Sequence, residues 1–143
     1  MTLIESVAKI AIFNEKAEIL VLRRSDTHPS RPHWTDMPGG LANSGESENH
    51  TVVREAQEET GITLNPSDIK LFYTEAEYYS EIGKSVNKLF YFVSLEKTPA
   101  VKISWEHESY EWCTLDQLLA RDDLQEFYRD GIKYAINHDL FTF

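Results

Sequence analysis

The sequence predicts an α+β fold in which a mixed β-sheet lies between helices, as in an α/β/α sandwich. Three observations lead to this prediction. The chain has 143 residues, close to the usual size of one domain, so residues 1–143 are expected to form a single domain. Hydrophobic residues make up 41% and aromatic residues 12%, enough to fill one core. Strand patterns come first, then one helix, then strands, then helices, an order typical of a mixed sheet covered by helices.

The first part of the chain predicts a β-hairpin followed by a short strand. The alternating stretch Ser6–Phe13 is expected to form one strand and Glu18–Arg24 its return strand, with a polar turn between them. A loop over residues 25–33 carries two prolines and two histidines. The segment after this loop is expected to end a short strand at Pro38, before a Gly-Gly pair that permits unusual backbone angles.

The middle of the chain predicts one helix and a second hairpin. The helix is expected to run from Glu48 to Thr60, because Ser47 suits the N-cap position and Gly61 stands where glycine commonly ends helices. Two β-rich runs follow, Ile69–Tyr79 and Val86–Leu95, separated by a polar turn. These runs are expected to pair as antiparallel neighbours.

The last part of the chain predicts a strand and two helices. Glu108–Thr114 is expected to be a strand. Thr114 and Gln117 have the spacing of a capping box, which predicts the start of a short helix. A longer helix is expected over Leu124–Asn137.

Composition narrows the classes of partner. The chain has 14 Lys and Arg against 24 Asp and Glu, a formal net charge of −10, which argues against nucleic acid polymers and anionic membranes as partners. Cys113 is the one cysteine, so no internal disulfide can form, and this usage fits a reducing compartment. The first residues lack a signal-peptide pattern, and no stretch approaches the length of a membrane span. We expect a cytoplasmic protein.

An acidic cluster occupies the predicted helix over 48–60. Glu55, Glu58 and Glu59 lie three and four positions apart, so they share one side of the helix and repel one another. Hard divalent cations such as Mg²⁺ take oxygen ligands and keep waters that a phosphate can replace. The cluster is therefore a candidate metal site, with Arg54 placed to pair with Glu58 one turn later.

The residues around this cluster follow a fixed spacing. Gly40 is followed by Glu46, then by Arg54-Glu55-Ala56, by Glu58-Glu59, and by Gly61-Ile62. A chance match of seven such fixed positions is on the order of 10⁻⁷ at ordinary residue frequencies. Over residues 40–62 the chain resembles the Nudix hydrolase family, whose signature is G-x5-E-x7-R-E-U-x-E-E-x-G-U, with U a bulky aliphatic residue. Ala56 is smaller than the usual U residue. Outside this box, the segments ILVLRR, WTDMPGG and EWCTLD also look like Nudix sequences.

The resemblance implies the Nudix fold and a metal-dependent hydrolase. Water would attack a phosphorus in the diphosphate linkage of a nucleoside diphosphate derivative or a nucleoside triphosphate. The metal would be Mg²⁺, with Mn²⁺ as a substitute. By analogy its ligands are the carboxylates of Glu55, Glu58 and Glu59 and the backbone carbonyl of Gly40. Arg54 would orient these carboxylates. A small nucleotide is the implied partner, and a homodimer is compatible with the family.

The general base is left open by the sequence. In this family it is a box glutamate, here Glu55, or an acidic residue of a later loop. The segment WEHESYEW supplies Glu106, Glu108 and Glu111. Glu106 is preferred because it is expected in the loop, where mobility suits a catalytic residue, and Glu111 comes next.

Substrate selection is expected to come from residues outside the box. Arg23 and Arg31 can meet phosphate, and aromatic side chains can stack on a base. The candidates are Trp34, Tyr78 and Tyr79. Within the family a tyrosine about sixteen residues after the box accompanies dinucleoside polyphosphate hydrolases, and the two tyrosines lie there. Dinucleoside polyphosphate hydrolysis is therefore an alternative specific activity.

Two further classes remain. A Nudix-fold module that binds a nucleotide without cleaving it is one, but such modules usually lack box glutamates, which are all present here. A Nudix-fold isomerase is the other, and this chemistry calls for a reactive cysteine in the pocket. Cys113 is expected to be buried instead.

Overall fold

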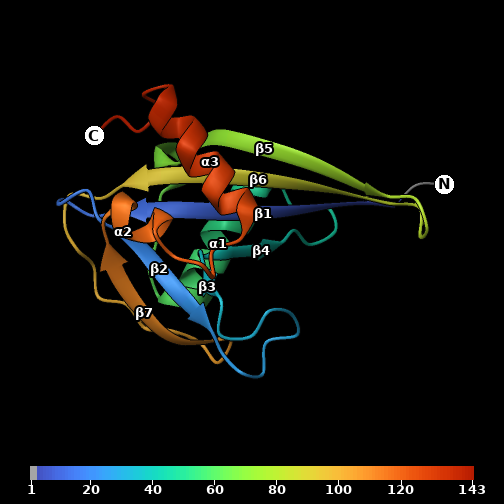
Figure 1. Ribbon diagram of the computed structural model, residues 1–143, viewed down its shortest axis with the longest axis horizontal. Coiled ribbons are helices and arrows are strands. Elements are labelled where there is room, and N and C mark those ends of the chain that lie inside the picture. Colours follow the sequence, from blue (N-terminus) through green and yellow to red (C-terminus); the bar gives the residue numbers. More distant parts are fainter. Residues whose placement is uncertain (1–2) are drawn as a thin grey trace.

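The computed structural model describes residues 3–143 and has seven strands, two α-helices of twelve or more residues and two short helices (Figure 1). The elements are β1 (Leu3–Phe13), β2 (Ile19–Arg24), β3 (Thr35–Asp36), β4 (Gly39–Leu41), α1 (Glu48–Thr60), a 3₁₀ turn (Pro66–Asp68), β5 (Lys70–Tyr79), β6 (Lys84–Ser94), β7 (His107–Cys113), α2 (Leu115–Leu119) and α3 (Glu126–Asn137).

All strands belong to one mixed sheet, as predicted. Its main order is β3-β2-β1-β6-β5, while β4 pairs with β1 and β7 pairs with β2. The β1–β6 pair is parallel along its whole length, from Leu3↔Lys84 to Phe13↔Ser94, and the other pairs are antiparallel. The predicted second hairpin is confirmed as β5–β6.

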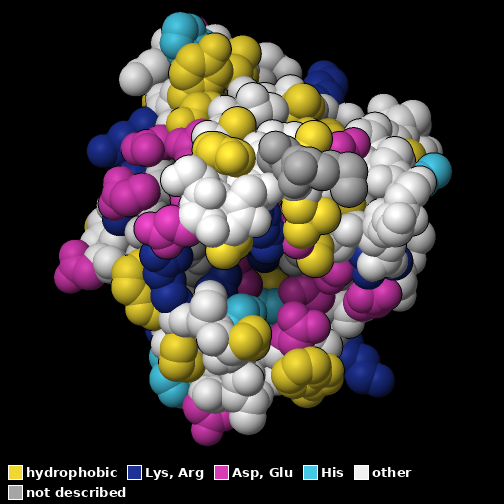
Figure 2. Space-filling view, turned by 90° about the vertical axis from the view of Figure 1, so that its right-hand side faces the viewer, with side chains coloured by type: hydrophobic (Ala, Val, Ile, Leu, Met, Phe, Trp, Pro, Cys, Tyr) yellow, Lys and Arg dark blue, Asp and Glu magenta, His cyan; other side chains and the backbone are white. Residues whose placement is uncertain are grey.

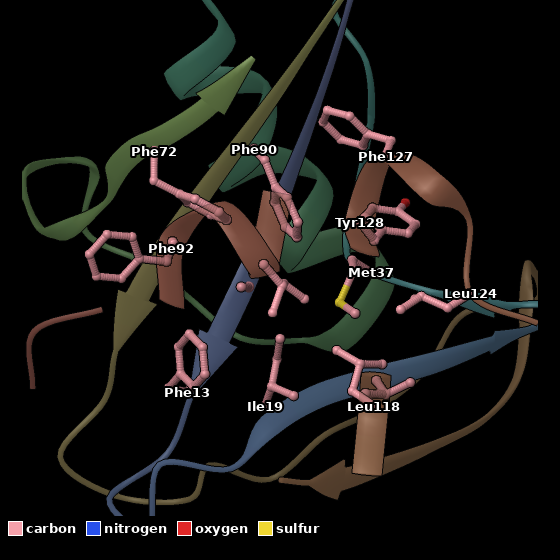
Figure 3. Close-up of a cluster of buried hydrophobic side chains, with 14 of the residues drawn as sticks. Phe13, Ile19, Met37, Phe72, Phe90, Phe92, Leu118, Leu124, Phe127 and Tyr128 are labelled. Carbon is pink, nitrogen blue, oxygen red and sulfur yellow. The ribbon is translucent and has the colours of Figure 1, made fainter. Parts of the chain in front are cut away.

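Two apolar layers cover the two faces of the sheet. Alternate residues of β1 divide between them: Ile10 and Ile12 pack on the α1 side, whereas Ala11 and Phe13 pack on the side of α2 and α3. In Figure 1, α3 crosses the near face and α1 lies behind the sheet. Figure 3 shows the buried cluster of the α3 side, in which Tyr128 and Leu124 lie beside Met37 while Phe72 and Phe92 lie farther away. Met37 is fully buried. The α/β/α sandwich is therefore confirmed.

The caps of α1 are those the sequence predicts. The Ser47 hydroxyl accepts a hydrogen bond from the backbone N–H of His50 at 3.3 Å. Gly61 ends the helix with φ 73°, a left-handed conformation that favours glycine, and its N–H donates to the carbonyl of Gln57. The capping box of Thr114 and Gln117 at the start of α2 is also confirmed.

Strands β1 and β2 diverge, and the chain over 35–41 fills the space between them. β1 pairs with β2 only at Phe13↔Ile19. Farther along, β3 pairs with β2 and β4 pairs with β1. The backbone N–H of Ile10 donates to the carbonyl of Pro38 at 2.9 Å. We call residues 35–41 the wedge, because this segment splits the sheet next to α1.

The predicted boundaries are wrong at several strands. β1 begins at Leu3 rather than Ser6, because β6 pairs with its whole length. The short strand ends at Asp36 rather than Pro38, and β4 was not predicted. A strand of three residues has no periodicity to read, and pairing with β1 alone defines it. No helix within residues 3–143 has the length and hydropathy needed to cross a membrane.

Candidate active site

The candidate site lies where α1 meets the wedge. The Glu59 carboxylate is buried, with 2% of the residue exposed, and its Oε1 accepts a hydrogen bond from the backbone N–H of Gly39 at 2.8 Å. The Glu55 carboxylate lies against Gly40, where a Cβ would stand 2.9 Å from Glu55 Oε1. A side chain at Gly40 would therefore displace this carboxylate. The wedge backbone and two helix carboxylates face one another directly.

Arg54 joins the acidic residues of the box. Its Nε donates to Glu46 at 2.8 Å, and its Nη1 lies 3.1 Å from Glu55 and 3.2 Å from Glu58. Its Nη2 also donates to the carbonyl of Leu41 at 3.3 Å. The hydrogen bond from Arg54 lowers the pKa of Glu46 to about 2. Arg54 thus links the helix to the loop before it.

The positive charges and hydrogen-bond donors around the Glu55 and Glu59 carboxylates do not offset the cost of burying these charges. Burial raises the pKa of Glu59 to about 8, although Lys9 and the N–H of Gly39 act in the opposite direction. Burial also raises the pKa of Glu55, and the neighbouring Glu58 adds to this rise against the opposing effect of Arg54. Both shifts show that the site disfavours the ionised forms of these groups. A bound cation would reverse that preference.

The donor set fits a hard divalent cation, although the side chains do not converge on one. As they lie within residues 3–143, no three Asp, Glu, His or Cys side chains form a group that could hold a metal ion. The physical reason is visible: Arg54 holds Glu55 and Glu58, and Gly39 holds Glu59. The oxygen-only chemistry and the close approach of Glu55 to Gly40 match the ligand type that Mg²⁺ prefers.

A buried polar cluster under the site was missed by the sequence prediction. Lys9 of β1 reaches the carbonyl oxygen atoms of Gly39 at 3.0 Å and Met37 at 3.2 Å, and Asp36 Oδ1 at 3.4 Å. Asp36 Oδ2 is 2.9 Å from Nε2 of His107, which begins β7. Lys9 occupies a core-facing position in the alternation of β1, and this was the one signal available in the sequence.

The charges of this cluster support one another. Burial opposes ionisation of Asp36, but Lys9, His107 and Arg24 together hold the pKa of Asp36 well below its ordinary value. Burial likewise opposes the charge on Lys9, but Asp36, Tyr128 and Glu59 together outweigh it and keep the pKa of Lys9 raised. Lys9 and Asp36 are therefore an ion pair inside the protein.

The later acidic residues have different surroundings. Glu108 Oε1 lies 2.7 Å from His33 Nδ1, and Glu111 pairs with Arg121. The backbone carbonyl of Glu106 accepts a hydrogen bond from the N–H of Ser25 at 3.0 Å. Glu106 lies in the turn directly before His107, whose Nδ1 is 3.7 Å from Glu59. Glu106 and Glu108 both adjoin His107 in the chain, but the Glu108 carboxylate is paired with His33.

Two of the expected substrate residues lie together at a cavity of about 320 Å³. The Arg31 guanidinium stands 5.5 Å from the centre of the Trp34 ring and donates to Gln125 at 2.7 Å. Lys88 of β6 and Glu75 of β5 line the same cavity. Sheet register connects it to the wedge: Val7 pairs with both Leu41 and Lys88, so the backbones of Leu41 and Lys88 are about 10 Å apart at two strand spacings.

The other expected substrate residues lie elsewhere. Arg23 pairs with Asp123 at 3.1 Å and lines a separate cavity with Glu111. Tyr78 and Tyr79 are exposed near the end of the β5–β6 hairpin and line a third cavity. The structure therefore does not bring the five residues into one pocket.

Figure 2 shows the side of the molecule on which the β5–β6 hairpin ends. The face is hollowed near its centre, and acidic, basic and histidine side chains border the hollow. Such mixed charge suits a ligand that carries both phosphates and polar groups, provided that a cation screens the acidic residues.

Comparisons with known proteins agree with this geometry. The family model of the NUDIX domain matches residues 3–134. The asymmetrical bis(5'-nucleosyl)-tetraphosphatase of Caenorhabditis elegans is 32% identical over 111 residues, which is 78% of each chain. The crystal structure of the MutT protein from Methanosarcina mazei Go1 superposes with a TM-score of 0.82 at 28% identity and covers 96% of both chains. The crystal structure of a C. elegans Ap4A hydrolase complex gives a TM-score of 0.66 at 26% identity, covering 94% of this chain and 99% of the other.

The family match extends over most of the chain. The box begins in β4, continues through the following turn and α1, and ends at Ile62, and its Glu55 and Glu59 face the Gly39–Gly40 backbone. The chain therefore belongs to the Nudix hydrolase family.

Proposed function

We propose that this protein is a Mg²⁺-dependent nucleotide diphosphohydrolase of the cytoplasm, with Mn²⁺ able to replace Mg²⁺. The observation that carries the proposal is the pair of under-compensated carboxylates, Glu55 and Glu59, held against the backbone of Gly39 and Gly40. A metal ion bound there would neutralise phosphate charge and lower the pKa of a water. Phosphoryl transfer asks mainly for positioning and charge neutralisation.

The residues of the box have distinct roles in this proposal. Glu55, Glu58 and Glu59 would hold the metal, together with the carbonyl of Gly40. Glu58 is 56% exposed at its side chain, so it can turn from Arg54 toward a metal without disturbing the core. Arg54 would then keep Glu55 and Glu46 in place through the contacts it already makes.

For the general base we propose Glu106, with Glu55 as the alternative. Glu108 and Glu111 are already paired with His33 and Arg121, and such pairing favours a structural role. Glu106 lies in a half-buried turn beside His107, which approaches Glu59. A carboxylate in this turn can accept the proton of an attacking water.

The cavity of Arg31 and Trp34 is the proposed site for the nucleoside end of the substrate. The Trp34 ring can stack on a base, and Lys88 can meet a phosphate between this cavity and the wedge. Arg31 and His33 have positive φ values of 46° and 66°, and such strained backbone is often kept at ligand sites. The separation of about 10 Å between Leu41 and Lys88 leaves room for a chain of phosphates.

Dinucleoside polyphosphates are the proposed specific substrates. The relatives named as asymmetrical tetraphosphatases support this choice. A non-catalytic sensor is less well supported, because all box glutamates are present. An isomerase is also less well supported, since Cys113 is buried in the apolar cluster on the α3 side rather than beside the glutamates.

A nucleotide panel tests the proposal. Nucleoside triphosphates, diphosphate sugars, dinucleoside polyphosphates and coenzyme derivatives are incubated with the protein and Mg²⁺, and products are resolved by chromatography. We expect turnover that the substitution Glu58→Gln lowers at least about 100-fold. Glu48→Gln, at the other end of α1, is the control and should retain turnover. Tight nucleotide binding without products under these conditions would favour the sensor.

A further inference from the structure

Five groups under the active site form a ring in which all neighbours but one are in hydrogen-bond contact; His107 Nδ1, buried without a hydrogen-bond partner among residues 3–143, faces Glu59 across the remaining gap. Glu59 Oε1 accepts from the Gly39 N–H at 2.8 Å, and the Gly39 carbonyl accepts from Lys9 Nζ at 3.0 Å. Lys9 Nζ lies 3.4 Å from Asp36 Oδ1. Asp36 Oδ2 lies 2.9 Å from His107 Nε2, and His107 Nδ1 lies 3.7 Å from Glu59 Oε2. We call this set the Lys9 ring.

The ring lies where the sheet is split. Lys9 comes from β1, Asp36 and Gly39 from the wedge, His107 from β7 and Glu59 from α1. Few backbone hydrogen bonds join β1 to β2 in this region, because they pair only at Phe13↔Ile19. Backbone pairing holds the wedge to β1 and β2, whereas α1 reaches the wedge through side chains, Glu59 at the Gly39 N–H and Arg54 at the Leu41 carbonyl. The Lys9 ammonium holds the wedge from the β1 side, by donating to carbonyl groups on both sides of Pro38.

Stability alone does not account for the ring. Its three charged members are buried: Lys9 is 9%, Asp36 1% and Glu59 2% exposed. Replacing a buried ion pair by apolar residues of similar volume is often neutral or stabilising. An apolar contact, however, could not orient a carbonyl or a carboxylate, because it lacks directional hydrogen bonds.

We propose that Lys9 and Asp36 are positioning residues that hold Glu59 and the Gly39–Gly40 backbone in the arrangement needed to bind the metal. This inference rests on the proposed function of the same site. Lys9 sets the direction of the Gly39 peptide, and Gly40 follows it by one residue. Asp36 contacts both Lys9 and His107, and so links the ammonium that holds the Gly39 peptide to the imidazole that faces Glu59 at 3.7 Å. Residues that hold metal ligands in place without touching the metal commonly tune metal affinity and activity.

Tyr128 supplies a control, because it contacts Asp36 as well. Its hydroxyl donates to Asp36 Oδ1 at 2.8 Å, and it comes from α3, outside the ring. Tyr128→Phe removes a buried hydrogen bond to Asp36 without opening the ring. A variant that only weakens packing around Asp36 should therefore resemble Tyr128→Phe.

The experiment compares the wild type with Lys9→Met, the double variant Lys9→Met/Asp36→Asn and Tyr128→Phe. The double variant removes the two opposite charges together, while the side-chain amide at position 36 can accept a hydrogen bond from Arg24, which lies 3.3 Å from Asp36; it decides the question if the single variant does not fold. Binding of Mn²⁺ alone is measured from the electron paramagnetic resonance signal of the free ion. Turnover is measured as kcat and KM on the nucleotide that the wild type cleaves best, and Tm by circular dichroism.

We expect the Kd for Mn²⁺ to rise, and kcat to fall, about tenfold or more in the Lys9 variants, with a much smaller change in KM. Tyr128→Phe should lower Tm but leave the Kd for Mn²⁺ and kcat near wild type. Wild-type Kd and kcat in a folded Lys9 variant would overturn the inference, as would an equal loss in Tyr128→Phe. A wild type that neither binds Mn²⁺ nor cleaves any nucleotide would instead overturn the proposed function.

Discussion

At the scale of single residues, Glu59 shows how far the site departs from a stable arrangement. Its carboxylate is buried in the side of α1 and faces Gly39, with Glu55 and Asp36 nearby. Burial is the main reason that its pKa rises from 4.5 to about 8. In the metal-free protein, ionising Glu59 therefore costs stability rather than adding it.

The pH dependence of unfolding tests this cost. Below about pH 4.5 Glu59 is protonated in both the folded and unfolded states, and above about pH 8 it is ionised in both, so its penalty develops between these values. The free energy of unfolding should fall across this range in EDTA, by about 1.4 kcal/mol for each unit of pKa displacement. Glu59→Gln should flatten the fall, measured by urea denaturation, whereas Glu58→Gln should not. If the free energy of unfolding of Glu59→Gln depends on pH as steeply as that of the wild type, the assignment of this penalty to Glu59 is refuted.

At the scale of elements, the wedge is what brings the site together. The caps and the apolar side of α1 come from its own residues and the two that flank it. The position of Gly39 and Gly40 against that helix depends on β4, a strand of three residues that pairs with β1. Gly39 adopts φ 134°, and a Cβ there would stand 2.6 Å from Lys9 Cα. Only a glycine allows this close approach of two strands.

Gly39→Ala tests the wedge. We expect a loss of roughly 2–4 kcal/mol in the free energy of unfolding, because the added methyl group meets backbone atoms that cannot move aside. Gly45→Ala is the control: Gly45 also has a positive φ, 77°, but a Cβ there meets nothing within 4 Å. This control should cost only about 1 kcal/mol. Equal losses, measured by chemical denaturation, would show that backbone conformation matters and the close approach does not.

At the scale of the whole molecule, charge and metal are coupled. The protein carries a formal charge of −10, and acidic side chains border the hollow in Figure 2. A polyphosphate would be repelled by this surface unless a cation intervened. A divalent ion that binds the folded state alone also stabilises it, by about 2.7 kcal/mol at a concentration 100 times its Kd.

Thermal unfolding with and without Mg²⁺ tests this coupling. We expect Mg²⁺ to raise Tm by several degrees, while NaCl at the same ionic strength should raise it less, because screening is not specific to the site. In Glu59→Gln the additional rise in Tm with Mg²⁺, beyond that with NaCl, should largely disappear, since one metal ligand is lost. If Mg²⁺ and NaCl act alike in the wild type, general screening accounts for the effect and the metal site is refuted.

Much of the fold could be predicted because its signals are local. Helix α1 was bounded by Ser47 and Gly61, whose capping preferences depend on a few neighbouring residues. The second hairpin was recognisable from two β-rich runs and a polar turn. The three residues of β4 carried no such signal, and neither did the early start of β1, because long-range pairing determines both.

The sequence by itself determined the family and the reaction class, because the box residues are close together in the chain and their spacing can be read directly. Only the tertiary structure decided what surrounds them. It placed Lys9, Asp36 and His107 under Glu59, and it put Arg31 and Trp34 at a different cavity from Tyr78 and Tyr79. The physical reason is that these contacts join β1, β7, α1 and the wedge across a split in the sheet, and no local pattern records which distant segments meet there.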